Sequence, residues 1–257
     1  MTAASQARRN HHPLYQCAHY RSEGPFDTLR SAEKIVPLVL SIVPARSVVD
    51  VGCGSGAWLA VFQEHGIESI LGIDGAHVDP GWLRIPPERF RALDLREPFQ
   101  IQESFDLAVC LEVSEHLPPE SAPALVRSLV ALAPVILFSA AVPQQGGIGH
   151  VNEQWPSYWR ELFEKERFRM LDVVRKEIWM DREIKFWYRQ NLYLVVREDV
   201  VQSRTTYSEA AGYADDLLLI HASILERQLS FRCFFRNLPR IIGRAASHVR
   251  NRIVSAA

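Results

Sequence analysis

The sequence predicts an α/β fold: a doubly wound, Rossmann-like, mostly parallel sheet with helices on both faces. Two observations lead to this class. A short β-branched run over residues 48–51 ends in the alternating glycines of GCGSG and passes directly into residues with helical spacing, which is typical of a strand, a tight turn and a helix. Further short apolar runs follow, separated by amphipathic stretches, as expected for repeated βα units.

The chain begins with a polar stretch over residues 1–26 that has no apolar pattern able to build a core. We interpret it as an N-terminal arm, and its histidines as part of a solvated tail rather than as metal ligands, so no metal site is expected. A helix follows from an N-cap at Asp27, with apolar residues at helical spacing from Leu29 to Leu40. Pro37 is expected to kink or split this helix.

The glycine-rich turn distinguishes two classes of cofactor. Gly52, Gly54 and Gly56 stand at every second position, where they let a ligand approach the backbone and the N-terminus of the next helix. The spacing G-x-G-x-G differs from the G-x-G-x-x-G of dinucleotide sites, which disfavours an NAD-dependent oxidoreductase. Asp50 at the strand end would repel a pyrophosphate, whereas it suits a ligand that carries an ammonium and a sulfonium.

The next two expected strands also end in acids. Residues 69–73 end at Asp74, about 20 residues past the glycines, where an acid hydrogen-bonds the ribose hydroxyls of an adenosine. Residues 90–93 end at Asp94, which is placed to accept a hydrogen bond from an adenine amino group. Acids at successive strand ends predict an adenosine-containing cofactor at this edge of the sheet.

The residues expected to bind the acceptor lie in the second half of the domain. A fourth strand over residues 105–110 leads into Leu111-Glu112-Val113-Ser114-Glu115-His116, and then come a helix over 121–132 and a strand over 135–138. The segment 141–159 leaves the same sheet edge, is rich in glycine, amide and aromatic groups, and is expected to close over an acceptor. The last expected strands cover residues 168–174 and 190–196.

With these motifs in place, the chain resembles the class I S-adenosylmethionine-dependent methyltransferases, in particular their small-molecule, type 11 branch. The resemblance covers about residues 20 to 197 and rests on VDVGCGSG, GIDG, ALDL and FDLAVCLEVSEHL. It implies a seven-stranded sheet of order 3-2-1-4-5-7-6 with an antiparallel strand seven. It also implies that Asp50 and the glycines hold the methionine moiety of S-adenosylmethionine, Asp74 the ribose, and Asp94 with Leu95 the adenine; we add Glu112 to the expected cofactor-binding residues.

Methyl transfer is an in-line displacement at an activated carbon, so the protein mainly aligns the nucleophile and removes its proton. His150 is the first candidate for the base and His116 the second. Each histidine would alternatively brace its own loop through backbone hydrogen bonds. Glu112 and Glu115 would orient either histidine or bind an acceptor hydroxyl, although two solvated acids in a turn explain the pair equally well.

Three aromatic residues follow the acceptor segment. Trp155, Tyr158 and Trp159 would form a stacking wall for a sugar or an aromatic acceptor, but aromatic residues at this spacing more often belong to the core. Cys53 is rejected as a nucleophile, because it lies in the cofactor turn without a sequence partner to generate a thiolate.

The function favoured by these residues is O-methylation of a saccharide or a similar small metabolite. An N-methyltransferase and a protein or RNA methyltransferase are the alternatives, and a non-catalytic module that binds S-adenosylmethionine is the alternative of another class. Specific nucleic-acid binding is not expected, because the net charge of the 257 residues is −1 and the region after the fourth strand lacks the Asp/Asn-Pro-Pro-Tyr/Phe signature of base-amino methylation.

The predicted organisation is an arm over residues 1–26, a methyltransferase domain over 27–200 and a C-terminal extension over 201–257. From Arg227 onward, arginines recur near helical spacing between Phe, Leu, Ile and Val residues, which describes a basic amphipathic helix. It would lie on an anionic membrane surface or pack on the domain with a solvated arginine face. The chain has no apolar run near 18 residues and no apolar signal core, so we expect a cytoplasmic protein with a possible peripheral contact at the inner membrane face.

Overall fold

The computed structural model describes residues 28–203, 207 and 220–222. The predicted N-terminal arm, the Asp27 cap and the basic helix after Arg227 lie outside the described residues. In the described part of the chain, no helix is long and apolar enough to cross a lipid bilayer.

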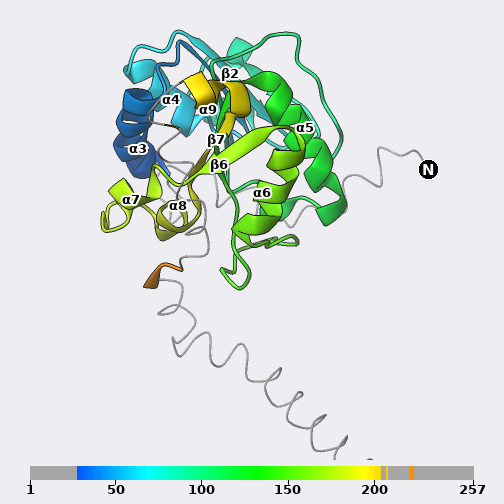
Figure 1. Ribbon diagram of the computed structural model, residues 1–257. Helices are drawn as coiled ribbons and strands as arrows, with labels where there is room; N and C mark the ends of the chain where they lie inside the picture. The colour runs from blue at the N-terminus through cyan, green and yellow to red at the C-terminus, as the bar shows by residue number, and fades with distance from the viewer. Residues whose placement is uncertain (1–27, 204–206, 208–219, 223–257) are drawn as a thin grey trace, which may run out of the picture. The chain divides into compact units, whose positions relative to one another are not determined.

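A seven-stranded sheet forms the centre of the fold, in the order β3-β2-β1-β4-β5-β7-β6 (Figure 1). Neighbouring strands from β3 to β5 pair in parallel, whereas β7 pairs antiparallel with both β5 and β6. The expected order and the antiparallel last strand are therefore confirmed. The strands are β1 (Ser47–Val51), β2 (Ser69–Asp74), β3 (Phe90–Ala92), β4 (Leu107–Leu111), β5 (Val135–Ser139), β6 (Phe168–Leu171) and β7 (Tyr193–Arg197).

Helices cover both faces of this sheet, as Figure 1 shows for α3 and α4 on one side and for α5 and α6 on the other. Alternate residues of each strand belong to two separate apolar clusters: in β1, Val48 packs with α3 and α4, while Val49 packs with α5 and α6. This alternation follows from the two-residue period of a strand, which places successive side chains on opposite faces. The helices are α3 (Leu29–Ile42), α4 (Ala57–Glu64), α5 (Ala122–Leu132), α6 (Pro156–Lys165), α7 (Arg175–Ile178), α8 (Phe186–Asn191) and α9 (Glu198–Ser203).

Several expected boundaries are corrected. The strand expected over 168–174 ends at Leu171, because α7 begins at Arg175, and the strand expected from residue 190 begins at Tyr193, because α8 occupies the preceding residues. Between β2 and β3 the chain forms two single 3-10 turns, η1 (Pro80–Trp82) and η2 (Pro87–Arg89). Pro37 lies inside α3 without dividing it.

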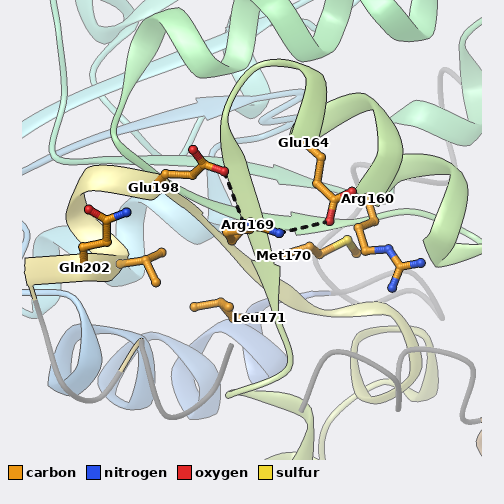
Figure 2. Close-up of a pocket in the computed structure, with 8 residues that line it drawn as sticks. Arg160, Glu164, Arg169, Met170, Leu171, Glu198 and Gln202 are labelled. Carbon is orange, nitrogen blue, oxygen red and sulfur yellow. Dashed lines mark ion pairs between the residues drawn. The ribbon is translucent and has the colours of Figure 1, made fainter. Parts of the chain in front are cut away.

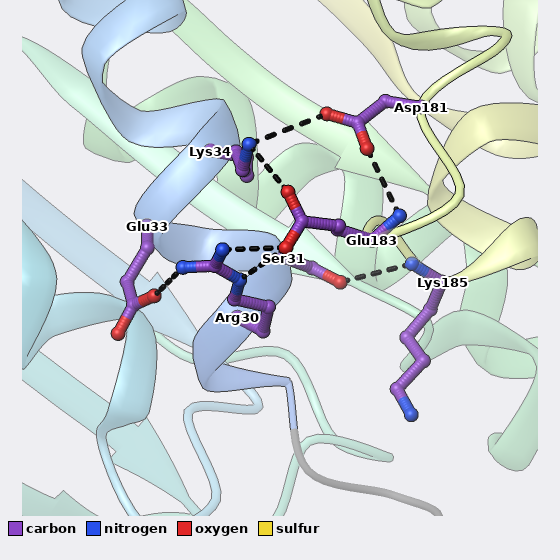
Figure 3. A network of polar contacts seen from close by, with 7 residues as sticks. All are labelled: Arg30, Ser31, Glu33, Lys34, Asp181, Glu183 and Lys185. Atoms are coloured by element: carbon purple, nitrogen blue, oxygen red, sulfur yellow. Dashed lines mark hydrogen bonds and ion pairs between the residues drawn. The ribbon is translucent and has the colours of Figure 1, made fainter.

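A polar network attaches the segment before α8 to helix α3 (Figure 3). Glu183 accepts hydrogen bonds from Arg30 and lies 2.7 Å from the Lys34 ammonium, and these contacts lower the pKa of the Glu183 carboxyl to about 2. The charged groups are exposed, so the stabilisation that they provide is small. The buried member is Ser31, whose hydroxyl accepts a hydrogen bond from the Lys185 backbone N–H at 3.0 Å and fixes the register of the two segments.

Candidate active site

The turn after β1 has a backbone that only glycines adopt without strain. Gly52 has a φ of 84°, and a Cβ placed on it would lie 2.2 Å from Val113 Cγ2. Gly54, with a φ of 54°, donates its N–H to Asp74 Oδ2 at 2.7 Å. Gly56 caps the N-terminus of α4 in the left-handed conformation. The turn thus presents bare backbone and a helix N-terminus at the carboxyl edge of the sheet.

Asp50 is a buried acid, 3% exposed, at the end of β1. Among the described residues, none donates a hydrogen bond or forms an ion pair with its carboxylate. Burial raises the pKa of Asp50 well above its ordinary value, and the nearby Asp74 carboxylate raises it further. Burial also raises the pKa of the adjacent Cys53 thiol, which supports its rejection as a nucleophile. A ligand with a positive charge would compensate Asp50, so the site fits the ammonium of a methionine moiety.

Asp74 ends β2 and joins the two neighbouring turns. Its carboxylate accepts the N–H of Gly54 at 2.7 Å and that of Gly75 at 2.6 Å, and His77 Nε2 lies 3.7 Å away. Burial raises the pKa of Asp74, although the two N–H donors and His77 oppose this shift. Asp74 therefore organises the turn in addition to any contact with a ribose.

The two residues expected at the adenine differ in exposure. The Asp94 carboxylate is exposed and forms hydrogen bonds with the Arg96 guanidinium, the shortest of them 2.5 Å from oxygen to nitrogen. Leu95 is buried in the apolar cluster under α5. A hydrogen bond from adenine to Asp94 would share the carboxylate with Arg96, so the role of Asp94 stays a prediction.

Glu112 follows β4 in a strained conformation, with a φ of 55°. Gln145 donates to its Oε2 at 2.9 Å and Asn191 to its Oε1 at 3.0 Å, and Asn191 also donates to Gln145 Oε1 at 2.8 Å. Both oxygens of Glu112 thus accept from this amide pair, and the expectation that Glu112 orients one of the histidines stays a prediction. Sequence reasoning missed Gln145 and Asn191, which have no motif around them.

The two candidate bases come together. The rings of His116 and His150 are 4.8 Å apart between centroids and nearly perpendicular, at 83°. The acid that orients His150 is Glu153, whose Oε1 lies 2.9 Å from His150 Nδ1. Burial raises the pKa of Glu153, but hydrogen bonds from His150, Gly146 N–H and Gln144 N–H together lower it below its ordinary value. An H-x-x-E spacing in a loop was the signal that could have identified this pair.

The aromatic residues of the acceptor segment separate into core and surface. Trp159 is 1% exposed and packs against Phe138 with ring centroids 5.3 Å apart, so it is a core residue and not part of a stacking wall. Tyr158 is partly buried beside it, while Trp155 is exposed. Only Tyr158 and Trp155 keep accessible surface for an acceptor.

A pocket of about 390 Å³ lies beside β6, which is the edge strand at the other end of the sheet from β3. Its lining residues come from α6, β6 and α9 (Figure 2). Arg169 spans it and forms ion pairs with Glu164 at 3.7 Å and Glu198 at 3.3 Å. None of the residues predicted for cofactor or catalysis lines it. The candidate active site is therefore the carboxyl edge of β1, β2 and β4.

Comparison with known proteins places the chain in a family. Residues 18–177, more than half of the chain, match the family described as a methyltransferase domain. The chain belongs to this methyltransferase family. Together with the strand order, the match confirms the prediction of a class I S-adenosylmethionine-dependent methyltransferase.

Solved structures share the fold of this methyltransferase at low identity. SAM-bound CalS10, an amino pentose methyltransferase from Micromonospora echinaspora, is 19% identical with a TM-score of 0.52, over 73% of this chain and 98% of that chain. DesVI from Streptomyces venezuelae is 18% identical with a TM-score of 0.50, over 72% and 94%. At these identities the likeness concerns the fold. A search of curated proteins finds no match.

Proposed function

We propose that this methyltransferase transfers the methyl group of S-adenosylmethionine to a hydroxyl oxygen of a saccharide or a similar small metabolite. The observation that carries the proposal is the His116–His150 pair beside the end of β4, with Glu153 fixing one of the rings. A hydroxyl is a poor nucleophile until it loses its proton, and such a pair can promote that loss. The fold shared with an amino pentose methyltransferase is compatible with a saccharide acceptor.

The residues proposed to hold the cofactor follow the edge of the sheet. Asp50 would bind the ammonium, since it is a buried carboxylate without a partner among the described residues. Asp74 would accept from a ribose hydroxyl with the lone pairs not used by Gly54 and Gly75. The remaining proposed contacts are the backbone at Gly52, Gly54 and Gly56, Asp94 and Leu95 at the adenine, and Glu112. When bound, the cofactor supplies an activated methyl carbon.

The histidines would act on the acceptor rather than on the cofactor. His150 Nδ1 is engaged by the Glu153 carboxylate, so the neutral ring keeps its proton on Nδ1 and leaves Nε2 as the acceptor nitrogen. Nε2 can then take a proton from a hydroxyl, or it can bind a cation that lowers the pKa of the hydroxyl. Both mechanisms predict a loss of rate without a loss of cofactor binding when His150 is removed.

The test is methyl transfer from labelled S-adenosylmethionine to a panel of sugar hydroxyls, other hydroxyl compounds and amines. We expect hydroxyl products, and a decrease of about 10²–10⁴-fold in kcat in His150→Ala with nearly unchanged cofactor affinity. His65→Ala is the matched control, because His65 bonds Val61 O at the C-terminal end of α4, away from the site. Products on amines alone, or an unchanged rate in His150→Ala with a hydroxyl acceptor, would contradict the proposal.

A further inference from the structure

Three side chains that can bind metal ions lie close together at the carboxyl edge of the sheet, beside the end of β4 where the acceptor is expected. Glu115 and His116 belong to the 3-10 turn η3 (Ser114–His116) after β4, and His150 belongs to the segment between β5 and α6. One carboxylate oxygen and one nitrogen from each ring lie within 4.8 Å of one another. Glu115 and His116 are adjacent in the chain, whereas His150 follows His116 by 34 residues, so only the fold assembles the three groups.

Glu115 is the least expected member of this cluster. Its side chain is 0% exposed, and among the described residues neither carboxylate oxygen has a hydrogen-bond partner of ordinary geometry, although the Glu112 carboxyl and the N–H groups of Glu115 and Ala141 lie near it. A buried carboxylate without a partner is costly, and buried charges in proteins are usually paired or coordinate a metal. The position of Glu115 therefore indicates a missing positive charge.

Contacts at Nδ1 bear on which ring nitrogen carries the proton in each histidine. His116 Nδ1 lies 3.4 Å from the Gly149 carbonyl oxygen, which can only accept, so a hydrogen bond here requires the proton on Nδ1. His150 Nδ1 donates to Glu153 in the same way. In the neutral His150 ring this leaves Nε2 with the lone pair, and a carboxylate behind a ligating histidine, as Glu153 is here, is a common feature of metal sites.

The backbone holds the two segments together without a ligand. The carbonyl oxygen of Glu115 accepts the N–H of Val151 at 2.8 Å and that of Asn152 at 3.1 Å. The turn that carries Glu115 and His116 is thus fixed to the loop that carries His150. On this fixed backbone, the three side chains would rotate toward one another to complete a coordination shell.

We propose that Glu115, His116 and His150 bind a divalent first-row transition-metal cation. With bonds of about 2.1 Å, three donor atoms around one ion lie about 3.0–3.6 Å from one another, so donor atoms that are up to 4.8 Å apart have to approach by about 1 Å. Two imidazoles and one carboxylate form a ligand set that such cations accept while keeping open positions.

The open positions give the cation a function, and this part of the inference rests on the proposed O-methylation. An acceptor hydroxyl at an open position loses its proton more readily, because the cation stabilises the resulting oxyanion. The proton passes to water, the oxygen electron pair forms the bond to the methyl carbon, and the bond between that carbon and sulfur breaks with its electrons returning to sulfur. Binding of the cation itself does not depend on the identity of the acceptor.

The experiment is calorimetric titration of the full chain with Mn²⁺ in the absence of acceptor, together with thermal unfolding. We expect one site per chain, and a rise in unfolding temperature on addition of Mn²⁺, since a ligand that binds only the folded state stabilises it. Glu115→Gln and His150→Ala should each weaken binding at least tenfold and remove the rise. If Glu115→Gln fails to fold, the partly buried His150→Ala still provides the test. A His11→Gln, His12→Gln double variant is the matched control and should keep the site.

Unchanged Mn²⁺ binding in both site variants, or no binding by the wild type, would overturn the proposal. The two proposals fail separately. Hydroxyl methylation that a chelator leaves unchanged, in a chain that binds no Mn²⁺, refutes the cation and leaves O-methylation standing. Mn²⁺ binding that depends on Glu115, in an enzyme that methylates only amines, refutes O-methylation and leaves the cation site standing.

Discussion

Replacing Asp74 with alanine should damage both the fold and the cofactor site. The carboxylate accepts two backbone N–H groups, from Gly54 at 2.7 Å and from Gly75 at 2.6 Å. Hydrogen bonds to a charged group contribute about 1.5–3 kcal/mol each. Because burial raises the pKa of Asp74 and makes its ionisation costly, we take the lower end of the sum, about 3 kcal/mol of unfolding free energy. This loss corresponds to a decrease of about 6–12 °C in unfolding temperature.

The same substitution should reduce the affinity for S-adenosylmethionine about tenfold or more, the equivalent of one lost contact with the ribose. The assay pairs thermal unfolding with calorimetric titration of the cofactor. Asp106→Ala is the matched control, because Asp106 accepts the N–H groups of Arg46 and Ser47 at 2.7 and 3.0 Å, at the opposite end of β1. The control should lose stability and keep affinity. Equal cofactor binding by wild type and Asp74→Ala would refute the assignment, and an unchanged unfolding temperature would refute the stability argument.

Three further predictions concern other positions. Asp50→Asn should raise the unfolding temperature of the ligand-free protein at neutral pH and weaken cofactor binding. Burial raises the folded-state pKa of the Asp50 carboxyl, so the stability of the wild type declines as pH rises above the unfolded-state pKa. Unfolding temperatures of wild type and variant that change in parallel over a pH series would contradict this prediction. Gly147→Ala would place a Cβ 2.0 Å from His150 Nε2 and should lower kcat about 10²-fold at constant cofactor affinity. Gly81→Ala is the control, because a Cβ at that position lies 3.3 Å from its nearest neighbouring atom. A chain truncated after Asp216 should lose salt-sensitive flotation with anionic vesicles; equal flotation of both chains would rule out membrane binding by the basic helix.

The sequence alone was sufficient to predict the part of the fold that carries the expected cofactor-binding residues. The run from Val48 through Gly56 carries its information locally, since strand, turn and helix are set by residue types within a few positions. The acids at the ends of β1 and β2 lie where a parallel sheet must bring them, on one edge. The strand order followed from the family resemblance and is confirmed.

Other features were not visible locally. Helix α8 was missed because it is only six residues long, Phe186–Asn191, too short to show a periodic apolar stripe, and its last residue, Asn191, reaches Glu112 from a position 79 residues away. The residues around Trp159 in the sequence do not distinguish a buried aromatic residue from an exposed one. Only its packing against Phe138 assigned it to the core.

The tertiary structure also decided what the acceptor side contains. His116 and His150 were both identifiable as candidate bases, but their contact depends on the hydrogen bonds that tie the loop at Val151 to the carbonyl of Glu115. The burial of Glu115 depends on the same pairing, because a glutamate in a turn is ordinarily solvated. Long-range contacts of this kind have no signature in spacing or composition, so the cluster of one carboxylate and two imidazoles is a property of the fold.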